Sequence, residues 1–221
     1  MTNPSDIHSK AAAASGQTAD LIIAIKADLH AAMNGVAAQS LRQSGATYRL
    51  IYGVDLPRLR SIAADYRPDR KLALALWNDN IRETRMLAIL LCPPAEFDSN
   101  LADLWVESLR REESDLAGLL VMDLIAHAPY AVDKAFEWMA AERETYQLCG
   151  FLTSTRLLMQ GVQFSESAEA EIIDQAASAL PSTYQPLRRA AANALLRLAE
   201  ASPHLTADID KLMSAPLSSD E

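Results

Sequence analysis

Basic side chains are concentrated in one part of the chain, residues 42–85. This part holds nine arginines and lysines against five acidic residues, a net charge of +4, whereas residues 86–221 hold nine against 21, a net of −12. The whole-chain net charge of −9 argues against non-specific adhesion to nucleic acid, because the phosphates would be repelled at long range. The local excess still allows a small site that contacts phosphate, although a solvated face is the simpler interpretation.

The stretch "YRPDRK" (66–71) gives such a site a definite place. It sets Arg67, Arg70 and Lys71 beside the expected start of a helix, whose dipole is already positive at that end. The arrangement is mildly unfavourable alone and suits an anion, such as a phosphate, held there. Cationic side chains that simply point into water are the equally weighted alternative.

Aromatic side chains near the arginines offer a second way to bind nucleic acid. Arg82 and Arg85 are spaced i, i+3 on one helix face, one turn from Trp77. Trp77 and Trp138, however, hold the same place in an internal repeat, which favours packing in the core for both. Trp105 has no repeat partner that aligns, and its role stays undecided.

No ready-made catalytic motif accompanies these residues. The sequence has no glycine-rich phosphate loop, no His-x-x-x-His or Cys-x-x-Cys metal spacing and no Gly-x-Ser-x-Gly, so we expect neither a metal nor a cofactor. The acidic residues of "REESD" (111–115) most simply supply negative charge to the first turn of a helix. Cys92 and Cys149 lie in apolar stretches and are expected to be reduced thiols.

The elements that must position these residues are helices. Alanine and leucine dominate, and strand-favouring runs of Val, Ile and Thr are missing, which predicts an all-α protein. One helix follows a turn at Gly53, with Asp55 as its N-cap and Pro57 in its first turn. The periodicity predicts helices over residues 19–43, 56–66, 69–77, 80–91, 99–111, 114–127, 130–142, 145–160, 166–180, 185–201 and 205–213.

An internal repeat predicts how these helices are arranged. "WNDNIRETRMLAILL" (77–91) and "WMAAERETYQLCGFL" (138–152) share a tryptophan, the tripeptide Arg-Glu-Thr and two leucines in one register. The offset between them accommodates two units of about 30 residues, the size of a helix pair. Helix pairs of this size stack into an α-α superhelix of HEAT-like type, in which each pair buries its apolar face on the next.

The domain organisation follows from this repeat. We expect a single HEAT-like repeat domain over residues 18–213, between a flexible N-terminus (1–17) and a flexible tail (214–221). No apolar run approaches the ~20 residues that span a bilayer, and the N-terminus lacks the basic-then-apolar order of a secretory signal. A cytoplasmic protein without a membrane partner is therefore expected.

The stretch "YGVDLPRLRSIAADY", followed by "LALALWNDNIRETRMLAILL", resembles the AlkD-like DNA alkylation-repair proteins, which are HEAT-like repeat DNA glycosylases. The early repeats of that family read Tyr-x-Gly-Val-x-x-Pro-x-Leu-Arg, then Leu-Trp and a helix with Glu-x-Arg. The positions that match in this sequence are Tyr52, Gly53, Val54, Pro57, Leu59, Arg60, Leu76, Trp77, Glu83 and Arg85.

The resemblance implies a basic concave face that holds duplex DNA carrying alkylated purines, and cleavage of the N-glycosidic bond without flipping of the base. A positively charged base is already a good leaving group, so cation–π contact and a nearby carboxylate can lower the remaining barrier. On this basis the candidate DNA-binding residues are Arg58, Arg60, Arg67, Arg70, Lys71, Arg82, Arg85 and Arg156.

The second half of the chain departs from the family pattern. The window "RREESDLAGLLVMD" stands where the family has a Trp-Asp-x-x-Asp segment, and it contains no tryptophan. By the resemblance, Asp115 is the nearest candidate for the catalytic carboxylate, with Glu113 as its rival. Tyr146 and Gly150 stand where a later aromatic would be sought, and Arg156 is the arginine near them.

Two functional interpretations remain open. In the first, the protein is a divergent alkylpurine glycosylase or a binder of damaged duplex DNA. In the second, the solenoid is catalytically inactive and is a scaffold that binds a protein partner. Clustering of the basic residues on one surface favours the first interpretation, and scattering over the outer face favours the second.

Overall fold

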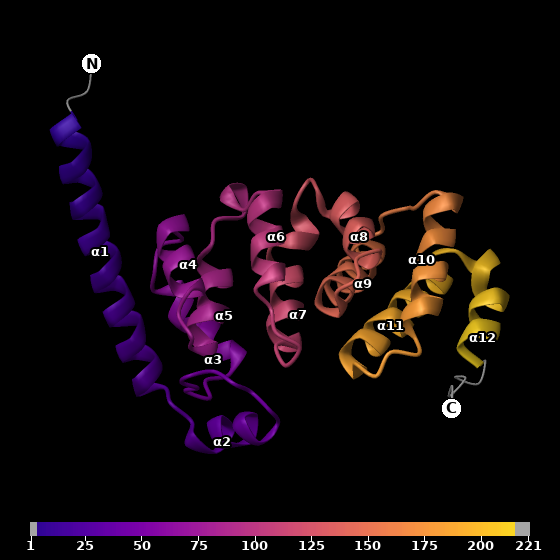
Figure 1. Ribbon diagram of the computed structural model, residues 1–221, viewed down its shortest axis with the longest axis horizontal. Coiled ribbons are helices and arrows are strands. Elements are labelled where there is room, and N and C mark those ends of the chain that lie inside the picture. Colours follow the sequence, from indigo (N-terminus) through magenta and orange to yellow (C-terminus); the bar gives the residue numbers. More distant parts are fainter. Residues whose placement is uncertain (1–3, 215–221) are drawn as a thin grey trace. The chain divides into compact units, whose positions relative to one another are not determined.

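The computed structural model describes the backbone of residues 4–214 and the side chains of residues 16–214. These residues form helices and no strand, apart from an isolated parallel bridge between Leu50 and Ile81. The all-helical prediction is confirmed (Figure 1). The α-helices are α1 (Pro4–Ala31), α2 (Gly35–Gln43), α3 (Leu56–Ala64), α4 (Arg70–Trp77), α5 (Arg82–Leu91), α6 (Ser99–Glu107), α7 (Ser114–Asp123), α8 (Ala131–Met139), α9 (Glu144–Met159), α10 (Glu166–Ala179), α11 (Gln185–Ala201) and α12 (Thr206–Ser214). Short 3-10 helices are η1 (Pro94–Glu96), η2 (Ile125–His127) and η3 (Pro203–Leu205).

The chain divides into two compact units, Met1–Glu96 and Phe97–Glu221. The first unit holds α1 to α5, and the second holds α6 to α12. Most expected helices begin and end within a few residues of the observed ones, because Pro, Gly and N-cap residues mark their boundaries. Of the expected tail, residues 215–221 lie outside the described part of the chain, as do residues 1–3 of the expected flexible N-terminus.

The expectation of one continuous helix over 19–43 is wrong. The chain forms two helices instead, and the bend between Gly16–Ala31 and Gly35–Gln43 is 96°. Asn34 is extended and caps α2: its side chain accepts a hydrogen bond from the backbone N–H of Ala37. The N–H of Asn34 itself donates to the carbonyl of Tyr52 at 2.9 Å, so a contact from later in the chain fixes the break.

In the described residues no single helix has the length and apolar composition to cross a membrane. The bent pair Gly16–Ala31 and Gly35–Gln43 passes that test of length and composition when the two helices are taken together.

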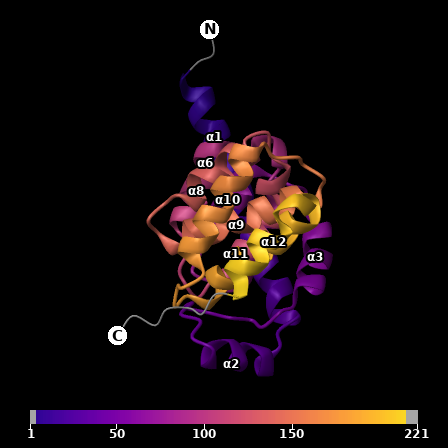
Figure 2. The same cartoon turned by 90° about the vertical axis from the view of Figure 1, so that its right-hand side faces the viewer.

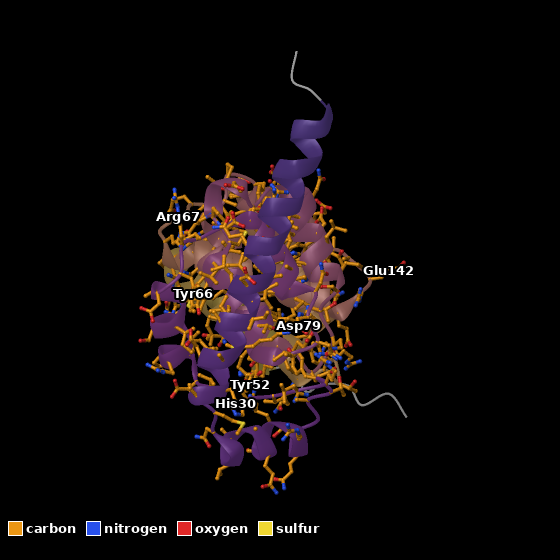
Figure 3. The ribbon with its side chains drawn as sticks, turned by 90° about the vertical axis from the view of Figure 1, so that its left-hand side faces the viewer. His30, Tyr52, Tyr66, Arg67, Asp79 and Glu142 are labelled. Atoms are coloured by element: carbon orange, nitrogen blue, oxygen red, sulfur yellow. The ribbon has the colours of Figure 1, made fainter. Side chains whose placement is uncertain are left out.

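Helix α1 is held to the first unit by apolar packing and by polar contacts on both of its sides. Ile25 and Leu29, one turn apart, are completely buried. The Tyr66 hydroxyl donates to the Asp28 carboxylate at 2.5 Å, while Lys26 pairs with Asp79 at 2.6 Å. Figure 3 shows Tyr66 on one side of α1 and Asp79 on the other. Burial, reinforced by the bond to Asp28, raises the pKa of Tyr66 to about 12.

The internal repeat corresponds to two helix pairs, α4–α5 in the first unit and α8–α9 in the second. Trp77 and Trp138 stand at the ends of α4 and α8 and are 6% and 1% exposed. Thr84 and Thr145 lie in the first turns of α5 and α9, and both are buried. The packing role predicted for the two tryptophans is confirmed, and so are the paired helices typical of HEAT-like repeats.

A buried carboxylate organises the first unit. Glu83, the second residue of α5, is fully buried, and it accepts the N–H of Tyr52 at 3.0 Å and the N–H of Gly53 at 2.9 Å. Gly53 has a φ of +74°, and a side chain there would collide with the backbone oxygen of Asn34 and lie 2.6 Å from the nitrogen of Ala38. The family-like segments around Gly53 and Glu83 therefore bind each other, and the resulting turn leads directly into α3.

In the second unit, α8 and α9 pack closely at Gly150. A Cβ atom added to Gly150 would lie 2.6 Å from the Met139 nitrogen and 2.8 Å from the Ala135 oxygen, both backbone atoms of α8. Cys149 beside it is fully buried, and burial raises the pKa of its thiol to about 12. The helix interface therefore has no room for even one additional methyl group.

Gly150→Ala should lower the free energy of unfolding by about 1–3 kcal/mol, because backbone atoms of α8 must move to make room for the methyl group. Gly118→Ala in the middle of α7 is the matched control, since nothing lies within 4 Å of the added Cβ. It should raise the free energy of unfolding by up to about 1 kcal/mol, from helix propensity alone. Urea denaturation followed by circular dichroism measures both. Changes of the same sign would contradict the close packing of α8 on α9.

Glu83→Ala should destabilise the protein by about 2–5 kcal/mol, because two buried N–H donors would lose their acceptor. Glu83→Gln keeps one acceptor oxygen and should have an intermediate effect. Glu142→Ala is the control: Glu142 is exposed and lies at the surface in Figure 3. It should change stability by less than about 0.5 kcal/mol. Equal losses for Glu83→Ala and Glu142→Ala in urea denaturation would refute this role for the buried carboxylate.

Candidate nucleic-acid interface

The turn between α3 and α4, residues 65–69, is the centre of the basic region in the first unit. Its position is fixed by the N–H of Asp69, which donates to the carbonyl of Leu91 at the end of α5 (3.0 Å). The Asp69 carboxylate then caps α4 by accepting the N–H of Leu72 at 2.8 Å. The negative charge of Asp69 is thus bound to the helix start, and the neighbouring cations lie on this turn and on the two helices beside it.

Two hollows flank this turn. The first has a volume of about 560 Å³ and lies between α1 and the start of α4, with Arg67 and Lys71 in its wall. The second, of about 380 Å³, lies between α3 and the end of α5, with Arg60 in its wall. Tyr66 and Pro68 line both hollows and separate them.

Arg60, Arg67 and Lys71 are therefore gathered around one turn, and we call these three residues the turn cluster. All three are exposed. Figure 3 shows Tyr66 and Arg67 on the same side of α1. Tyr66 was not singled out by sequence reasoning, although an aromatic residue directly before Arg-Pro could have drawn attention to it.

Two other predicted DNA contacts lie near the turn and differ from the cluster in their surroundings. Arg70 is half-buried, and its Nη1 donates to the carbonyl of Glu96 at 2.6 Å, which attaches η1 to α4. Arg58 is exposed, but it lies two residues before Arg60 on α3 and so projects roughly 200° away around the helix. It lines neither hollow.

Arg82 and Arg85 are directed at the protein more than at water. Arg85 is 7% exposed, and its guanidinium carbon lies 4.3 Å from the centre of the Trp77 ring. Nη1 of Arg82 lies 3.4 Å from the Glu83 carboxylate. The guanidinium of Arg85 thus has the Trp77 ring as a partner, and that of Arg82 has the Glu83 carboxylate. DNA contact by these two arginines stays a prediction, and their low exposure does not support it.

No tryptophan is exposed. Trp105, undecided from the sequence, is 2% exposed and packs edge-on against Phe97, with ring centroids 5.2 Å apart. Trp138 donates its indole N–H to Asp103 at 2.9 Å. With Trp77 beneath Arg85, all three indoles belong to the packed interior, so none of them presents a face on which an alkylated base could stack.

The two candidate carboxylates are in opposite environments. Glu113 is 1% exposed and accepts hydrogen bonds from the backbone N–H of Arg110 and from its guanidinium, both at 2.8 Å, which closes the turn before α7. Asp115 is exposed in the first turn of α7, and one of its oxygens accepts the N–H of Leu116 at 2.8 Å. Of the two, Asp115 is the carboxylate that a ligand can reach.

Arg156 lies between α7 and α9, in an apolar hollow of about 150 Å³ whose walls include Met122 and Met159. Its Nε atom is buried and makes no hydrogen bond. Tyr146, sought as an aromatic contact, instead donates its hydroxyl to the carbonyl of Asp103 at 3.2 Å and packs against Trp138. Burial, followed by the effect of Glu107, raises the pKa of Tyr146 above its usual range.

Sequence reasoning missed an acidic hollow of about 410 Å³ in the second unit, which Trp138 helps to line. Asp103 on α6 accepts hydrogen bonds there from Trp138 and from Lys134 (2.7 Å). Burial lowers the pKa of Lys134, but its bonds to Asp103 and Glu137 outweigh burial and leave the pKa raised. Among the side chains that the structure describes, no group of three His, Cys, Asp or Glu residues could hold a metal ion.

Comparisons with known proteins place this arrangement in a family. A family model described as "DNA alkylation repair enzyme" matches residues 25–213. A solved structure from "a new family of proteins related to the HEAT-like repeat DNA glycosylases with affinity for branched DNA structures" matches with a TM-score of 0.71 and 18% identity, over 86% of this chain and 80% of that one. No curated protein matches in sequence.

The solved structure shows that the fold is that of the HEAT-like repeat DNA glycosylases. The family match covers both units and includes the turn cluster, Glu83 and Asp115. The chain belongs to the DNA alkylation repair enzyme family.

Proposed function

We propose that this protein binds DNA through contacts of the turn cluster with backbone phosphates. The observation that carries the proposal is the gathering of Arg60, Arg67 and Lys71, all exposed, around one hydrogen-bonded turn in a chain whose net charge is −9. Membership of the DNA alkylation repair enzyme family supports it, and so does the described affinity of the structural neighbour for branched DNA.

The binding is directed at phosphates and not at bases. Exposed cations around a hydrogen-bonded turn can contact backbone phosphate oxygens, which carry no sequence information. The three indoles are buried, so no tryptophan offers a face on which a base could stack. The whole protein is acidic, so the attraction is confined to the turn cluster. Contacts between these cations and phosphates strengthen as the salt concentration falls.

The proposal extends to alkylated purines, with Asp115 as the carboxylate. An N-alkylated purine carries positive charge and leaves readily, so the protein has to stabilise the developing oxocarbenium ion and the attacking water. An exposed carboxylate can perform both tasks. Asp115 is exposed, whereas Glu113 is buried and bound to Arg110. The arrangement lacks an exposed tryptophan, so any rate gain would come from the carboxylate alone.

The triple variant Arg60→Ala/Arg67→Ala/Lys71→Ala should weaken DNA binding about tenfold or more at about 50 mM salt. The slope of log affinity against log salt should fall by about 2–3, close to one per lost phosphate contact. The measurement is fluorescence anisotropy with a labelled duplex of about 20 bp and a four-way junction built from the same sequence.

The matched control for DNA binding is Arg189→Ala/Arg197→Ala/Lys211→Ala, which removes three exposed cations from the second unit. This control changes the net charge by the same amount, and the DNA affinity should stay within about twofold, because none of its three cations belongs to the turn cluster. Equal weakening by both triple variants would show that net charge alone governs binding. Absence of any binding at low salt would instead favour the inactive scaffold.

The hydrolytic part of the proposal predicts release of 7-methylguanine or 3-methyladenine from alkylated duplex DNA above the spontaneous rate. Asp115→Asn should abolish that excess, because the amide carries no negative charge to stabilise the oxocarbenium ion. Asp133→Asn, an exposed aspartate in the first turn of α8, is the control and should retain it. Chromatography of the released base measures the rate. If Asp115→Asn still releases the base above the spontaneous rate, the protein is a glycosylase but Asp115 is not its catalytic carboxylate.

A further inference from the structure

A groove of about 740 Å³ lies between α10 and α12 in the second unit. Its floor is apolar and consists of Ala170, Ile173 and Ala177 from α10, with Leu205 and Leu212 opposite. Figure 2 shows α10 and α12 at the side of the second unit that faces the viewer. The side chains of the floor are half-buried or exposed, so the groove has apolar surface still open to a partner.

The walls of the groove are acidic. Glu166 and Asp174 on α10 and Asp208 on α12 are exposed carboxylates that line it. Glu169, 7% exposed, lies deeper: it accepts a hydrogen bond from the buried Ser202 hydroxyl and lies 3.5 Å from Nε2 of His204. His204 is the one basic side chain among the lining residues that the structure describes.

The spacing of these residues on α10 makes the groove a continuous strip. Glu166, Ala170 and Asp174 are spaced at i, i+4 and i+8 on α10. This spacing places one carboxylate on each side of the exposed Ala170. In a HEAT-like stack, the next helix covers such a face. Within residues 16–214 no further helix covers it, so the groove has the shape of a vacant helix position.

We propose that the groove binds an amphipathic helix of another protein, one whose apolar stripe is flanked by lysines or arginines. The apolar floor accepts the stripe, and the exposed carboxylates accept the cations, as in other helix-in-groove complexes. Charge complementarity favours this occupant over residues 215–221 of the chain itself, which carry two acidic residues and no basic ones, and over residues 86–221 of a second copy, which carry a net charge of −12. Residues 42–85 of a second copy carry a net charge of +4, so self-association is one of the outcomes tested below.

This interaction is separate from DNA binding. The groove repels phosphates, whereas the turn cluster attracts them, and the two surfaces belong to different units of the chain. A partner bound in the groove therefore need not compete with DNA, and each activity can be lost without the other.

The probe is a fluorescein-labelled synthetic helix of leucine and lysine with helical periodicity, about 18 residues long. One comparison peptide has glutamate in place of lysine, and a second has the same composition in an order that breaks the 3.6-residue period. Anisotropy titrations with the full chain at about 50 mM salt should show binding of the first peptide. The other two peptides should bind at least tenfold more weakly.

Two groove variants test the location. Ala170→Lys puts a cation between Glu166 and Asp174, offsets part of the negative charge of the α10 wall and fills the floor, so affinity should fall at least tenfold. Ala207→Lys is its matched control, because Ala207 is exposed on α12 and does not line the groove. Asp174→Asn/Asp208→Asn should weaken binding about three- to tenfold through the lost ion pairs. Asp133→Asn/Glu142→Gln removes the same charge elsewhere and should leave it unchanged.

Circular dichroism melting curves establish that each variant is folded, and Ala170 is exposed, so its replacement need not disturb the core. Equal affinity of Ala170→Lys and Ala207→Lys for the basic peptide would overturn the proposal, as would equal binding of the glutamate peptide. Tighter peptide binding after removal of residues 215–221 would show that the tail occupies the groove. Self-association that Asp174→Asn/Asp208→Asn abolishes would assign the groove to a second copy, and either result would replace this proposal.

Discussion

The carboxylate of Glu83 is the interaction on which the first unit depends. A buried charge is tolerated because it binds two backbone N–H groups, and in return it fixes the turn at Gly53. The Tyr52 carbonyl in that turn accepts the N–H of Asn34, which precedes α2, and the chain then continues into α3. The equivalent residue in the second repeat, Glu144, likewise reaches outside its own helix pair, to the hydroxyl of Ser182 (2.7 Å) and to Arg111 (2.7 Å). Polar contacts at helix starts thus complement the apolar packing of each pair.

The fold could be predicted from the sequence because its signals are local. Helical periodicity, prolines and N-cap aspartates specify most of the helix boundaries, and the spacing of Trp77 and Trp138 specifies a repeated helix pair. The break at Asn34 could not be predicted in the same way. Asn-Gly is a weak signal alone, and the hydrogen bond that stabilises the break comes from Tyr52, which is distant in the sequence. Tertiary contact overrides local helix propensity at that point.

The candidate site was predictable in part. The basic stretch identified Arg67 and Lys71, because the charge of a residue and its distance from a helix start can be read from the sequence. The burial of a side chain cannot be read in the same way. Arg85 has the spacing expected of a DNA contact, but in the structure it is buried over the ring of Trp77. The two carboxylates at the start of α7 show the same limit. Glu113 and Asp115 differ by two positions in the chain, and only the turn geometry makes one an internal ligand of Arg110 and leaves the other exposed.

The burial of the three tryptophans has a spectroscopic consequence. Each indole is surrounded by protein: Trp77 lies under a guanidinium, Trp105 packs against a phenyl ring, and Trp138 donates its N–H to a carboxylate. Their intrinsic fluorescence is therefore a reporter of the packed interior. Because Trp77 belongs to one unit and the other two to the second, replacing Trp77 with phenylalanine separates the two signals. The emission spectrum can then reveal whether the two units lose their structure together or in succession.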